Sequence, residues 1–393
     1  MAKPSFTKTV VGEVKNDLPP SPMNTFSAVG DVNGDGRPDI ALSGRDGRMV
    51  WLENPGPAGR EWKLHLVDEV QGMECGGSLW DLLGRGRRDI INGGDFRSDQ
   101  IFWWENPGTD GKWKKRVVAK AAGTQIHDTL IGDVTGDGRP SLLFTNQHAP
   151  GGTTIYRVPL PKDPTVSPWP GLEAVDTGKS ERNTGTGGTQ PEEGLAIGDI
   201  DGDGKNELVA GTHWYKYAGE GKSWKAHKFA TGYITTKITI GDLDGDGKNE
   251  IVLSEGDPCV YGRGQGGKAA WFKPAGDIGG LWEEHVIEDG LFDAHSLRLG
   301  DLCGNGKLDL LVGEVGKAGA GDAYEGHAPR IMVFENLGGG KFARHVIDEG
   351  TGIHEAALAD MRGIGVLDIV GKPLHGPEKW KVHVYYNNRP GRA

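Results

Sequence analysis

The sequence predicts an all-β fold, a seven-bladed β-propeller of four-stranded antiparallel blades. Three observations predict it. A short Asp/Gly-rich phrase recurs seven times along the 393 residues, apolar runs of strand length flank each copy, and the two chain ends carry complementary parts of one repeat. A regular repeat of a few tens of residues is typical of propellers and solenoids, and four strands per repeat are typical of a propeller blade.

The recurring phrase reads GDVNGDGRPDI at residues 30–40 and GDIDGDGKNEL at residues 198–208. Successive copies lie 43 to 66 residues apart, which is room for four short strands and their turns. The leading aspartates of the seven copies are Asp31, Asp81, Asp133, Asp199, Asp242, Asp301 and Asp360. We therefore assign one blade to each copy.

Each copy predicts a tight turn between the first two strands of a blade. Apolar runs precede and follow the Asp/Gly-rich turn, as in SAVG at 27–30 and IALSG at 40–44. Two strand-like runs joined by Gly, Asn and Asp are typical of a β-hairpin. The first run of each copy is therefore expected to be the innermost strand of its blade.

A third and a fourth strand complete the predicted blades. The third is rich in aromatic residues and the fourth begins with one, as in MVWLENP at 49–55 and WKLHLVDE at 62–69. Aromatic and β-branched residues are enriched in strands. Third strands are predicted at 49–55, 101–107, 153–159, 268–274, 330–336 and 382–388, and fourth strands at 62–69, 113–120, 224–231, 282–289 and 342–349.

The chain ends predict how the ring closes. No fourth strand follows the third strand at 382–388, whereas FTKTVVGE at 6–13 resembles the fourth strand FARHVIDE at 342–349. We expect an N-terminal strand at about residues 5–14 to complete the last blade, because a ring closed in this way leaves no exposed edge strand. Residues 1–393 then form a single propeller domain.

Composition argues against two classes of partner. The net charge of −11 disfavours nucleic acid and anionic membranes, and no apolar run is long enough to span a membrane. The start MAKPSFTKTVV lacks the apolar core of a signal peptide, so an extracellular or periplasmic location is expected only if a leader was removed. Three cysteines without metal-like spacing predict no disulfide framework.

The acidic turns have two interpretations. Oxygen side chains at alternate positions of a Gly-rich loop suit Ca²⁺. Alternatively, the aspartates only accept backbone hydrogen bonds in Asx-type turns, which the two turns with Leu83 and Arg85 or Arg362 and Ile364 favour. Three turns carry a complete calcium-like set: Asp31, Asn33, Asp35 and Asp39; Asp199, Asp201, Asp203 and Glu207; and Asp242, Asp244, Asp246 and Glu250.

This repeated DxDGDGxxD phrase with flanking strands resembles the FG-GAP or VCBS repeat, and the resemblance covers essentially the whole chain. The repeat is known from integrin α-subunit heads and from many sugar-acting propellers. Among these, the chain looks similar to rhamnose–glucuronate lyases, ulvan lyases and the propeller of aldos-2-ulose dehydratase. The resemblance implies β-elimination or dehydration of a carbohydrate at the centre of one face.

Blade geometry predicts which face holds the site. If the acidic turns lie on one face, the innermost strands begin on the opposite face, about six residues before each leading aspartate. Side chains at these positions should converge on the axis, and we expect the pocket there. They include Glu74, His127, Glu193, Lys237, His295 and His354.

The exits of the second strands and the long loops after them add further candidates on the same face. Loops longer than about a dozen residues are often functional. Expected substrate-binding residues are Arg45, Asp95, His148, His213, Glu255 and Glu314, and further catalytic candidates are Lys372, Tyr261, Arg263 and Tyr324.

Three roles remain open for the histidines at the axis. They could cap backbone groups around a water-filled channel. They could hold a divalent metal together with Glu74 or Glu193, where calcium would favour the carboxylates and a transition metal the imidazoles. They could also move protons in a β-elimination. The bases would then be His127 or His295, the acids Tyr261, Tyr324 or His354, and the cations Lys237, Arg263, Lys372 or the metal.

Two function hypotheses follow. The first is a metal-assisted carbohydrate lyase acting on a uronic-acid-containing or keto-sugar substrate at the central channel. The alternative is a non-catalytic propeller that binds glycan or protein. The axial residues differ from blade to blade, whereas a lectin tends to repeat its site, so the first hypothesis is favoured.

Overall fold

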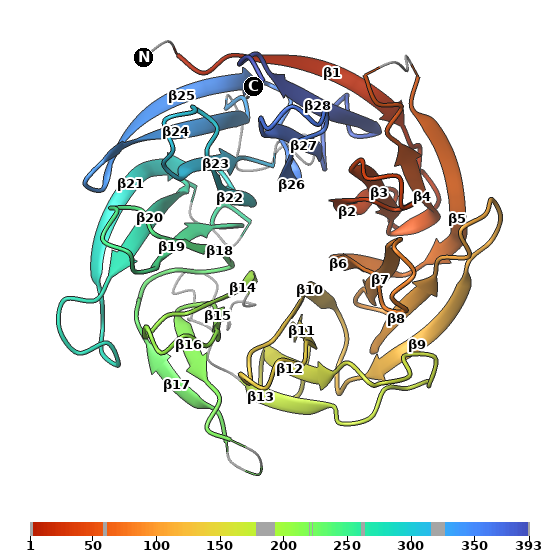
Figure 1. Cartoon of the computed structure of the whole chain (residues 1–393), viewed down its shortest axis with the longest axis horizontal. Coiled ribbons are helices and arrows are strands. Elements are labelled where there is room, and N and C mark those ends of the chain that lie inside the picture. Colours follow the sequence, from red (N-terminus) through yellow and green to blue (C-terminus); the bar gives the residue numbers. More distant parts are fainter. Residues whose placement is uncertain are drawn as a thin grey trace.

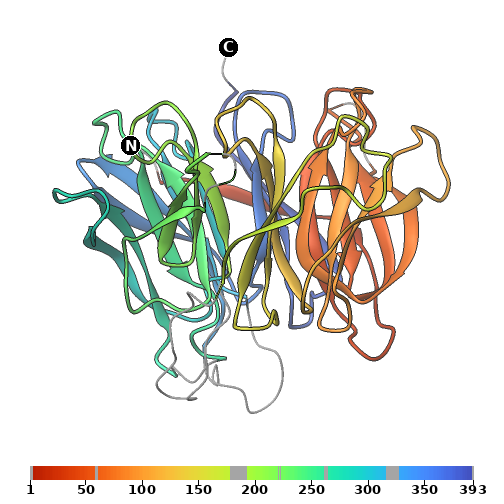
Figure 2. The ribbon, with the colours of Figure 1, turned by 90° about the horizontal axis from the view of Figure 1, so that it is seen from below.

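The computed structural model describes residues 3–57, 61–177, 193–219, 221, 223–260, 264–315 and 327–391. Seven four-stranded antiparallel sheets surround a common axis, and their strands run between the two faces of a disc (Figures 1 and 2). The regular elements of the described residues are strands, and none of these segments is a helix long and apolar enough to cross a membrane. The predicted seven-bladed β-propeller is confirmed.

The strands are numbered along the chain, and each blade is given from the axis outward. Blades 1 to 3 are β2 (Asn24–Gly30), β3 (Asp39–Gly44), β4 (Asp46–Glu53), β5 (Lys63–Gln71); β6 (Met73–Trp80), β7 (Asp89–Gly94), β8 (Gln100–Glu105), β9 (Lys114–Lys120); β10 (Ile126–Gly132), β11 (Ser141–Asn146), β12 (Thr154–Pro159), β13 (Glu173–Thr177). Blades 4 and 5 are β14 (Leu195–Gly198), β15 (Glu207–Ala210), β16 (His213–Lys216), β17 (Lys225–Lys228); β18 (Thr236–Gly241), β19 (Glu250–Glu255), β20 (Gly267–Lys273), β21 (Glu283–Leu291). Blades 6 and 7 are β22 (Ser296–Gly300), β23 (Asp309–Gly313), β24 (Arg330–Gly338), β25 (Lys341–Glu349); β26 (His354–Ala359), β27 (Asp368–Lys372), β28 (Lys381–Asn387) and β1 (Phe6–Glu13).

The N-terminal strand closes the ring as expected. β1 pairs antiparallel with β28, and the sheet order of the last blade is β1-β28-β27-β26. Two strands, β13 and β16, were not predicted from the sequence. β13 is mostly exposed and lacks apolar alternation, and β16 has only four residues, so neither gives a clear strand signal.

The leading aspartate of each turn caps backbone groups. Asp31 accepts hydrogen bonds from Gly34 N at 2.7 Å and from Gly36 N at 2.8 Å. The degenerate turns use the same geometry, since Asp81 and Asp360 accept from Gly86 N and Gly365 N. Asx-type hydrogen bonding therefore recurs in every turn, including the two without a calcium-like set, and calcium binding stays a prediction.

A lysine lies among the carboxylates in two of the three acidic turns. In blade 4, Lys216 Nζ forms an ion pair with Asp201 and lies 2.7 Å from Asp203 Oδ2. In blade 5, Lys273 makes the equivalent pairs with the turn acids, 2.7 Å from Asp246 Oδ2. In these two turns, a metal ion would therefore compete with the lysine ammonium for the same carboxylate oxygens.

A side-chain amide joins each of six blades to the preceding blade. Asn106 Nδ2 donates to Val32 O of blade 1 at 2.7 Å and to Arg88 O of its own blade at 2.8 Å. We call these contacts the inter-blade clamps. The donors are Asn54, Asn106, Asn206, Asn249, Asn336 and Asn387. Apolar clusters fill the space between neighbouring blades, so the core is a ring of interfaces.

Removing a buried clamp should destabilise the propeller. We expect Asn106→Ala to cost about 2–3 kcal/mol in the free energy of unfolding, because one buried and one part-buried carbonyl lose their donor. Asn206 is an exposed clamp with a 3.3 Å bond, so Asn206→Ala is the matched control and should cost less than about 1 kcal/mol. Denaturant unfolding measures both. Equal losses would show that the clamp adds nothing beyond a surface contact.

Acid should weaken the closing blade through His383. This residue lies on β28 opposite Val10 of β1, and burial, aided by nearby Lys8, lowers its pKa from 6.5 to about 4. Between these values the unfolded chain binds a proton that the folded chain does not, so stability present above pH 6.5 is lost as the pH falls. At pH 5 the expected loss is about 2 kcal/mol.

Urea unfolding at pH 7.5 and pH 5 tests this expectation. His383→Gln should remove that part of the pH dependence, whereas His285→Gln, on the outer strand β21, should keep it. The same pH dependence in all three proteins would assign the acid sensitivity to other groups.

Candidate functional site

Bulged inner strands bring consecutive side chains to the axis. The pairing register shifts in β2, β6, β10 and β26, at or beside the residues that begin these strands on the face opposite the turns. Glu355 lies in the bulge of β26 with a φ of 52°, a left-handed conformation that is unusual for a side-chain-bearing residue. A bulge re-aims a side chain, so neighbours along one strand can face the same site.

The resulting group of charged side chains is called the axial cluster. Its members come from blades 3 to 7 and are His127, Asp128, Glu193, Lys237, His295, His354, Glu355 and Lys372. Asp128 and Glu355 are part-exposed, and the other six are buried. The structure therefore brings together most of the central residues predicted from the sequence.

Glu193 is the hub of the axial cluster. Its Oε1 accepts a hydrogen bond from Gln147 Nε2 at 3.0 Å and lies 3.4 Å from His127 Nε2. Its Oε2 lies 3.1 Å from His295 Nε2 and 3.2 Å from Lys237 Nζ. One carboxylate thus contacts three cationic or potentially cationic groups.

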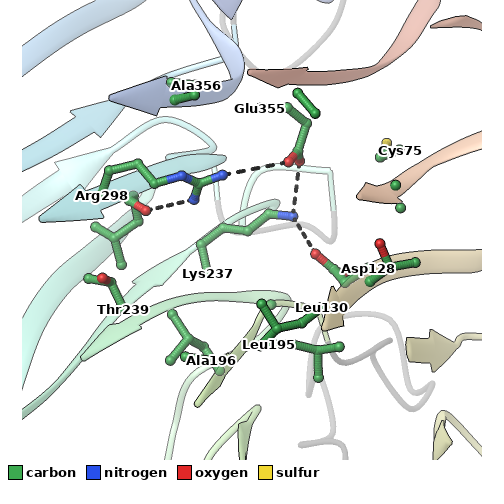
Figure 3. Close-up of a pocket in the computed structure, with 18 of the residues that line it drawn as sticks. Cys75, Asp128, Leu130, Leu195, Ala196, Lys237, Thr239, Arg298, Glu355 and Ala356 are labelled. Atoms are coloured by element: carbon green, nitrogen blue, oxygen red, sulfur yellow. Dashed lines mark hydrogen bonds and ion pairs between the residues drawn. The ribbon is translucent and has the colours of Figure 1, made fainter. Parts of the chain in front are cut away.

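Lys237 links the hub to two other carboxylates. Its Nζ lies 3.7 Å from Asp128 Oδ1 and 3.6 Å from Glu355 Oε1 (Figure 3). Arg298, on β22, approaches Glu355 from the other side, with 3.9 Å between Nη2 and Oε2. Donors and acceptors therefore alternate around this part of the axis.

The third histidine sits in a different environment. Lys372 Nζ lies 3.2 Å from His354 Nδ1, and Cys75 Sγ lies 3.9 Å from His354 Nε2. The rings of His295 and His354 stack with their centroids 4.6 Å apart. His354 thus faces a cation and a neighbouring imidazole, whereas His127 and His295 face carboxylates.

These environments separate the pKa values of the histidines. Burial lowers the pKa of His127, but Glu193 and Asp128 outweigh it and hold the pKa well above its usual value. The pKa of His295 is also well above normal, because Asp257 and Glu193 outweigh burial and Lys237. Burial, Lys372 and His295 together hold the pKa of His354 well below normal. The cluster therefore favours protonation of His127 and His295 and disfavours protonation of His354.

The two lysines of the axial cluster shift in opposite directions. Burial lowers the pKa of Lys372 to about 8. Burial also acts against charge on Lys237 and Glu355, but their opposite charges outweigh it, so the pKa of Lys237 is raised and that of Glu355 lowered. Groups with pKa values pushed apart are typical of acid–base sites, although structural ion pairs also produce them.

A cavity of about 470 Å³ lies on the turn side of the axial cluster. Asp128, Lys237, Arg298 and Glu355 line it together with small and aliphatic residues of the inner strands (Figure 3). We had expected the pocket on the face opposite the turns. Among the described residues, the first positions of the inner strands are buried and the turn halves are part-exposed, so this cavity opens toward the turns instead.

The second-strand residues mainly brace loops. Glu314 is fully buried and accepts hydrogen bonds from Phe292 N at 2.9 Å and Arg330 N at 2.7 Å, and Glu255 accepts from Ile234 N and Lys268 N. The other predicted substrate-binding residues differ in exposure: Asp95 and His213 are buried, Arg45 is part-buried and His148 is exposed. Their roles in substrate binding stay predictions.

One predicted residue, Glu74, is not a member of the axial cluster, and three others cannot be compared with it. Glu74 is paired with Arg45, whose Nη2 lies 2.8 and 2.6 Å from its two carboxylate oxygens. Tyr261, Arg263 and Tyr324 lie outside the described residues.

Sequence reasoning missed Asp128, Glu355 and Arg298. Strict strand alternation places only every second side chain on one face, so the residues next to His127 and His354 were not considered. The available signal was the dipeptides His-Asp at 127–128 and His-Glu at 354–355, which place an acid beside each imidazole. Arg298 had no comparable signal.

Among the described residues at the axis, three sets of side chains could hold a metal ion: Glu74, Cys75 and His127; His127, Glu193 and His295; and His295, His354 and Glu355. The second set contains two predicted histidines and the carboxylate at the hub. Atoms of His127, Glu193 and His295 lie within 4.8 Å of one another, and two imidazoles with one carboxylate suit a divalent ion. Lys237 Nζ lies 3.2 Å from the same Glu193 oxygen. A metal ion would therefore compete with this ammonium for the carboxylate.

Comparisons with known proteins identify the repeat and the fold. Residues 199–253 match the family model of the FG-GAP-like repeat, which covers the two turns that contain Lys-paired acids. No curated protein matches the chain.

Three similar solved structures carry different names. Rhamnogalacturonan lyase YesW has 15% identity and a TM-score of 0.50, over 99% of this chain and 76% of that one. The BP39L lectin from Burkholderia pseudomallei has 13% identity and a TM-score of 0.58, over 93% and 97%. BBS1N in complex with ARL6DN has 11% identity and a TM-score of 0.55, over 98% and 97%. At these identities the likeness shows the fold alone.

Removing the central cation should destabilise the fold. We expect Lys237→Met to lower the free energy of unfolding by about 3–5 kcal/mol, because the variant leaves buried carboxylates without their partner. Combining it with Glu193→Gln should recover part of the loss. Lys248→Met, at an exposed turn position, is the control and should change stability by less than about 0.5 kcal/mol. Denaturant unfolding that left Lys237→Met as stable as the parent would contradict an ion-paired cluster.

Proposed function

We propose that the protein is a carbohydrate-active carbon–oxygen lyase that reacts at the inner end of the axial cavity. One observation carries the proposal: Glu355, Lys237 and His127 line one cavity, and their pKa shifts favour a carboxylate, an ammonium and a protonated imidazole. β-Elimination needs a base, a cation and an acid in contact with one substrate. The similarity in fold to a rhamnogalacturonan lyase is consistent with this chemistry.

The proposed roles differ from those expected from the sequence. His127 and His295 were the expected bases, but their raised pKa values keep them protonated and favour a role as acids. Glu355 lines the cavity, and its Oε1 makes no hydrogen bond within the described chain although Lys237 Nζ lies 3.6 Å away, so we assign the role of base to this oxygen. The neutral His354 stays behind the cavity wall at Cys75.

The reaction then proceeds without a redox partner. Glu355 removes the proton next to the carbonyl or carboxyl group of the sugar, and the electron pair forms a carbon–carbon double bond as the β carbon–oxygen bond breaks. His127 returns a proton to the departing oxygen, which leaves as water or as a sugar alcohol. Lys237 and Arg298 stabilise the charge that builds on the substrate oxygen.

A divalent ion remains part of the proposal. The residues that would hold it are His127, Glu193 and His295, and when bound it would polarise the substrate oxygen as a Lewis acid. Calcium in the acidic turns, if it binds, would serve stability, because the turns lie away from the axial cluster.

Carbohydrate binding without catalysis is the second candidate function. The similar fold of the BP39L lectin supports it. The two candidates share a sugar as partner and the same cavity, and they differ only in whether a new double bond is formed.

Formation of a conjugated product tests the lyase. The protein is incubated at pH 7 with uronic-acid polysaccharides and with keto-sugars, with and without chelator, and the ultraviolet absorbance of an unsaturated sugar is followed. We expect new absorbance with at least one substrate. Glu355→Gln should lower kcat at least about a hundredfold, since general bases contribute roughly 10²–10⁴-fold.

A matched variant separates chemistry from folding. Glu283→Gln, at an exposed position of β21, should leave the rate unchanged. Absence of product with every substrate, together with retained sugar binding, would exclude the lyase and leave the binding protein. A Glu355→Gln variant with the parent rate would exclude Glu355 as the base.

A further inference from the structure

Among the described residues, buried side chains form one end of the axial cavity and part-exposed residues surround the other end. On β10 and β26, the residues that begin the strands are buried, whereas most residues nearer the turns are part-exposed. Lys237, Asp128 and Glu355 form the inner end, and behind them His354 and Lys372 are 1% and 0% exposed. A ligand in this cavity therefore enters from the turn face and meets the axial cluster end-on.

The wall of the cavity offers backbone groups. Each inner strand ends the strand order of its sheet, so among the described strands one of its edges pairs with no other strand (Figure 1). Edge strands present a row of N–H and C=O groups. The cavity wall thus provides alternating neutral donors and acceptors.

The floor of the cavity alternates in charge. Asp128, Lys237, Glu355 and Arg298 follow one another, with 3.7, 3.6 and 3.9 Å between successive partners. Lys237 Nζ and Glu355 Oε1 are buried atoms without a hydrogen bond in the described chain. Lys237 is 4% exposed and points toward the floor (Figure 3). Buried polar atoms normally have partners, so these atoms indicate a ligand or water that bonds to both.

We propose that this cavity binds the neutral, polyhydroxylated end group of a sugar, a specificity that rests on the proposed function of the same site. A hydroxyl donates to Glu355 and accepts from Lys237 at once. A carboxylate only accepts: it can bond to Lys237 or Arg298, but it leaves Glu355 without a donor and brings its own charge beside Asp128 and Glu355. An ammonium group only donates and would be repelled by Lys237 and Arg298.

The shape of the cavity sets the size of the ligand. A volume of about 470 Å³ is within the range of roughly 300–1,000 Å³ that holds small ligands. A closed inner end accepts a chain terminus or a free small sugar, whereas the middle of a polymer needs a groove open at both ends. For the proposed lyase this favours a neutral keto-sugar over an internal uronate.

Calorimetric titration with matched sugars tests the specificity. Glucose and galactose are each compared with glucuronate and galacturonate at pH 7. We expect each neutral sugar to bind at least about tenfold more tightly than its uronate, since a poorly compensated like-charge contact costs more than 1.4 kcal/mol. Removing one negative charge with Glu355→Gln should narrow that ratio.

A cavity-filling variant tests the location. Thr239→Trp, on the wall shown in Figure 3, should reduce binding of the neutral sugars at least tenfold, whereas Thr231→Trp, at an exposed site outside the cavity, should not. Circular dichroism confirms that each variant is folded. Uronates that bind as tightly as their neutral partners, binding of neither class, or full binding by folded Thr239→Trp would each overturn the proposal.

The two proposals fail in different ways. Neutral sugars that bind in the cavity without any conjugated product would exclude the lyase and leave this specificity intact. Conjugated product from uronates, together with tighter binding of uronates, would support the lyase and overturn the specificity.

Discussion

The hydrogen bonds at the turn face hold the ring together, and the rest of the structure depends on them. Each leading aspartate fixes its turn by accepting backbone N–H groups, and in six blades an asparagine amide then bonds the turn region of the preceding blade. The clamp exists in two forms. In the first form, the second strand begins with Asp and the clamp asparagine lies at the end of the third strand, as for Asp89 and Asn106. In the second form, the second strand begins with Glu and the clamp asparagine directly precedes that Glu, as for Asn206 and Glu207.

A ring fixed at one face leaves the other ends of its inner strands free to vary. Those ends carry the bulges and the unlike side chains, so the repeat supplies a rigid support and the irregular positions supply chemistry. The lysines show the same contrast between the regular turn face and the irregular strand ends at the axis. Lys216 and Lys273 pair with turn carboxylates near the surface, whereas Lys237 pairs with the buried Glu193 and with two carboxylates, Asp128 and Glu355, that line a cavity.

The repeat made the fold and the ring closure predictable, because turn chemistry and apolar runs are local signals. The central histidines followed from the same repeat used as a ruler. Local signals could not reveal the bulges, since a register shift depends on pairing with the next strand, and so Asp128 and Glu355 were missed. They could not give the protonation of His127 and His354 either, because that is set by groups from other blades. Local signals also could not show on which face the described cavity opens, because this depends on how neighbouring inner strands bury one another's ends.

The energetic cost of the axial cluster argues for a functional role. Buried ion pairs are seldom more stabilising than well-packed apolar side chains of similar volume, and the propeller already has apolar clusters between its blades. A channel plug made only for stability would be expected to satisfy its polar atoms. Here Lys237 Nζ, Glu355 Oε1 and His295 Nδ1 are buried without hydrogen bonds in the described chain. These atoms belong to adjacent side chains, and Lys237 and Glu355 line one cavity. The missing hydrogen bonds therefore support the proposal of a polar ligand that bonds to them.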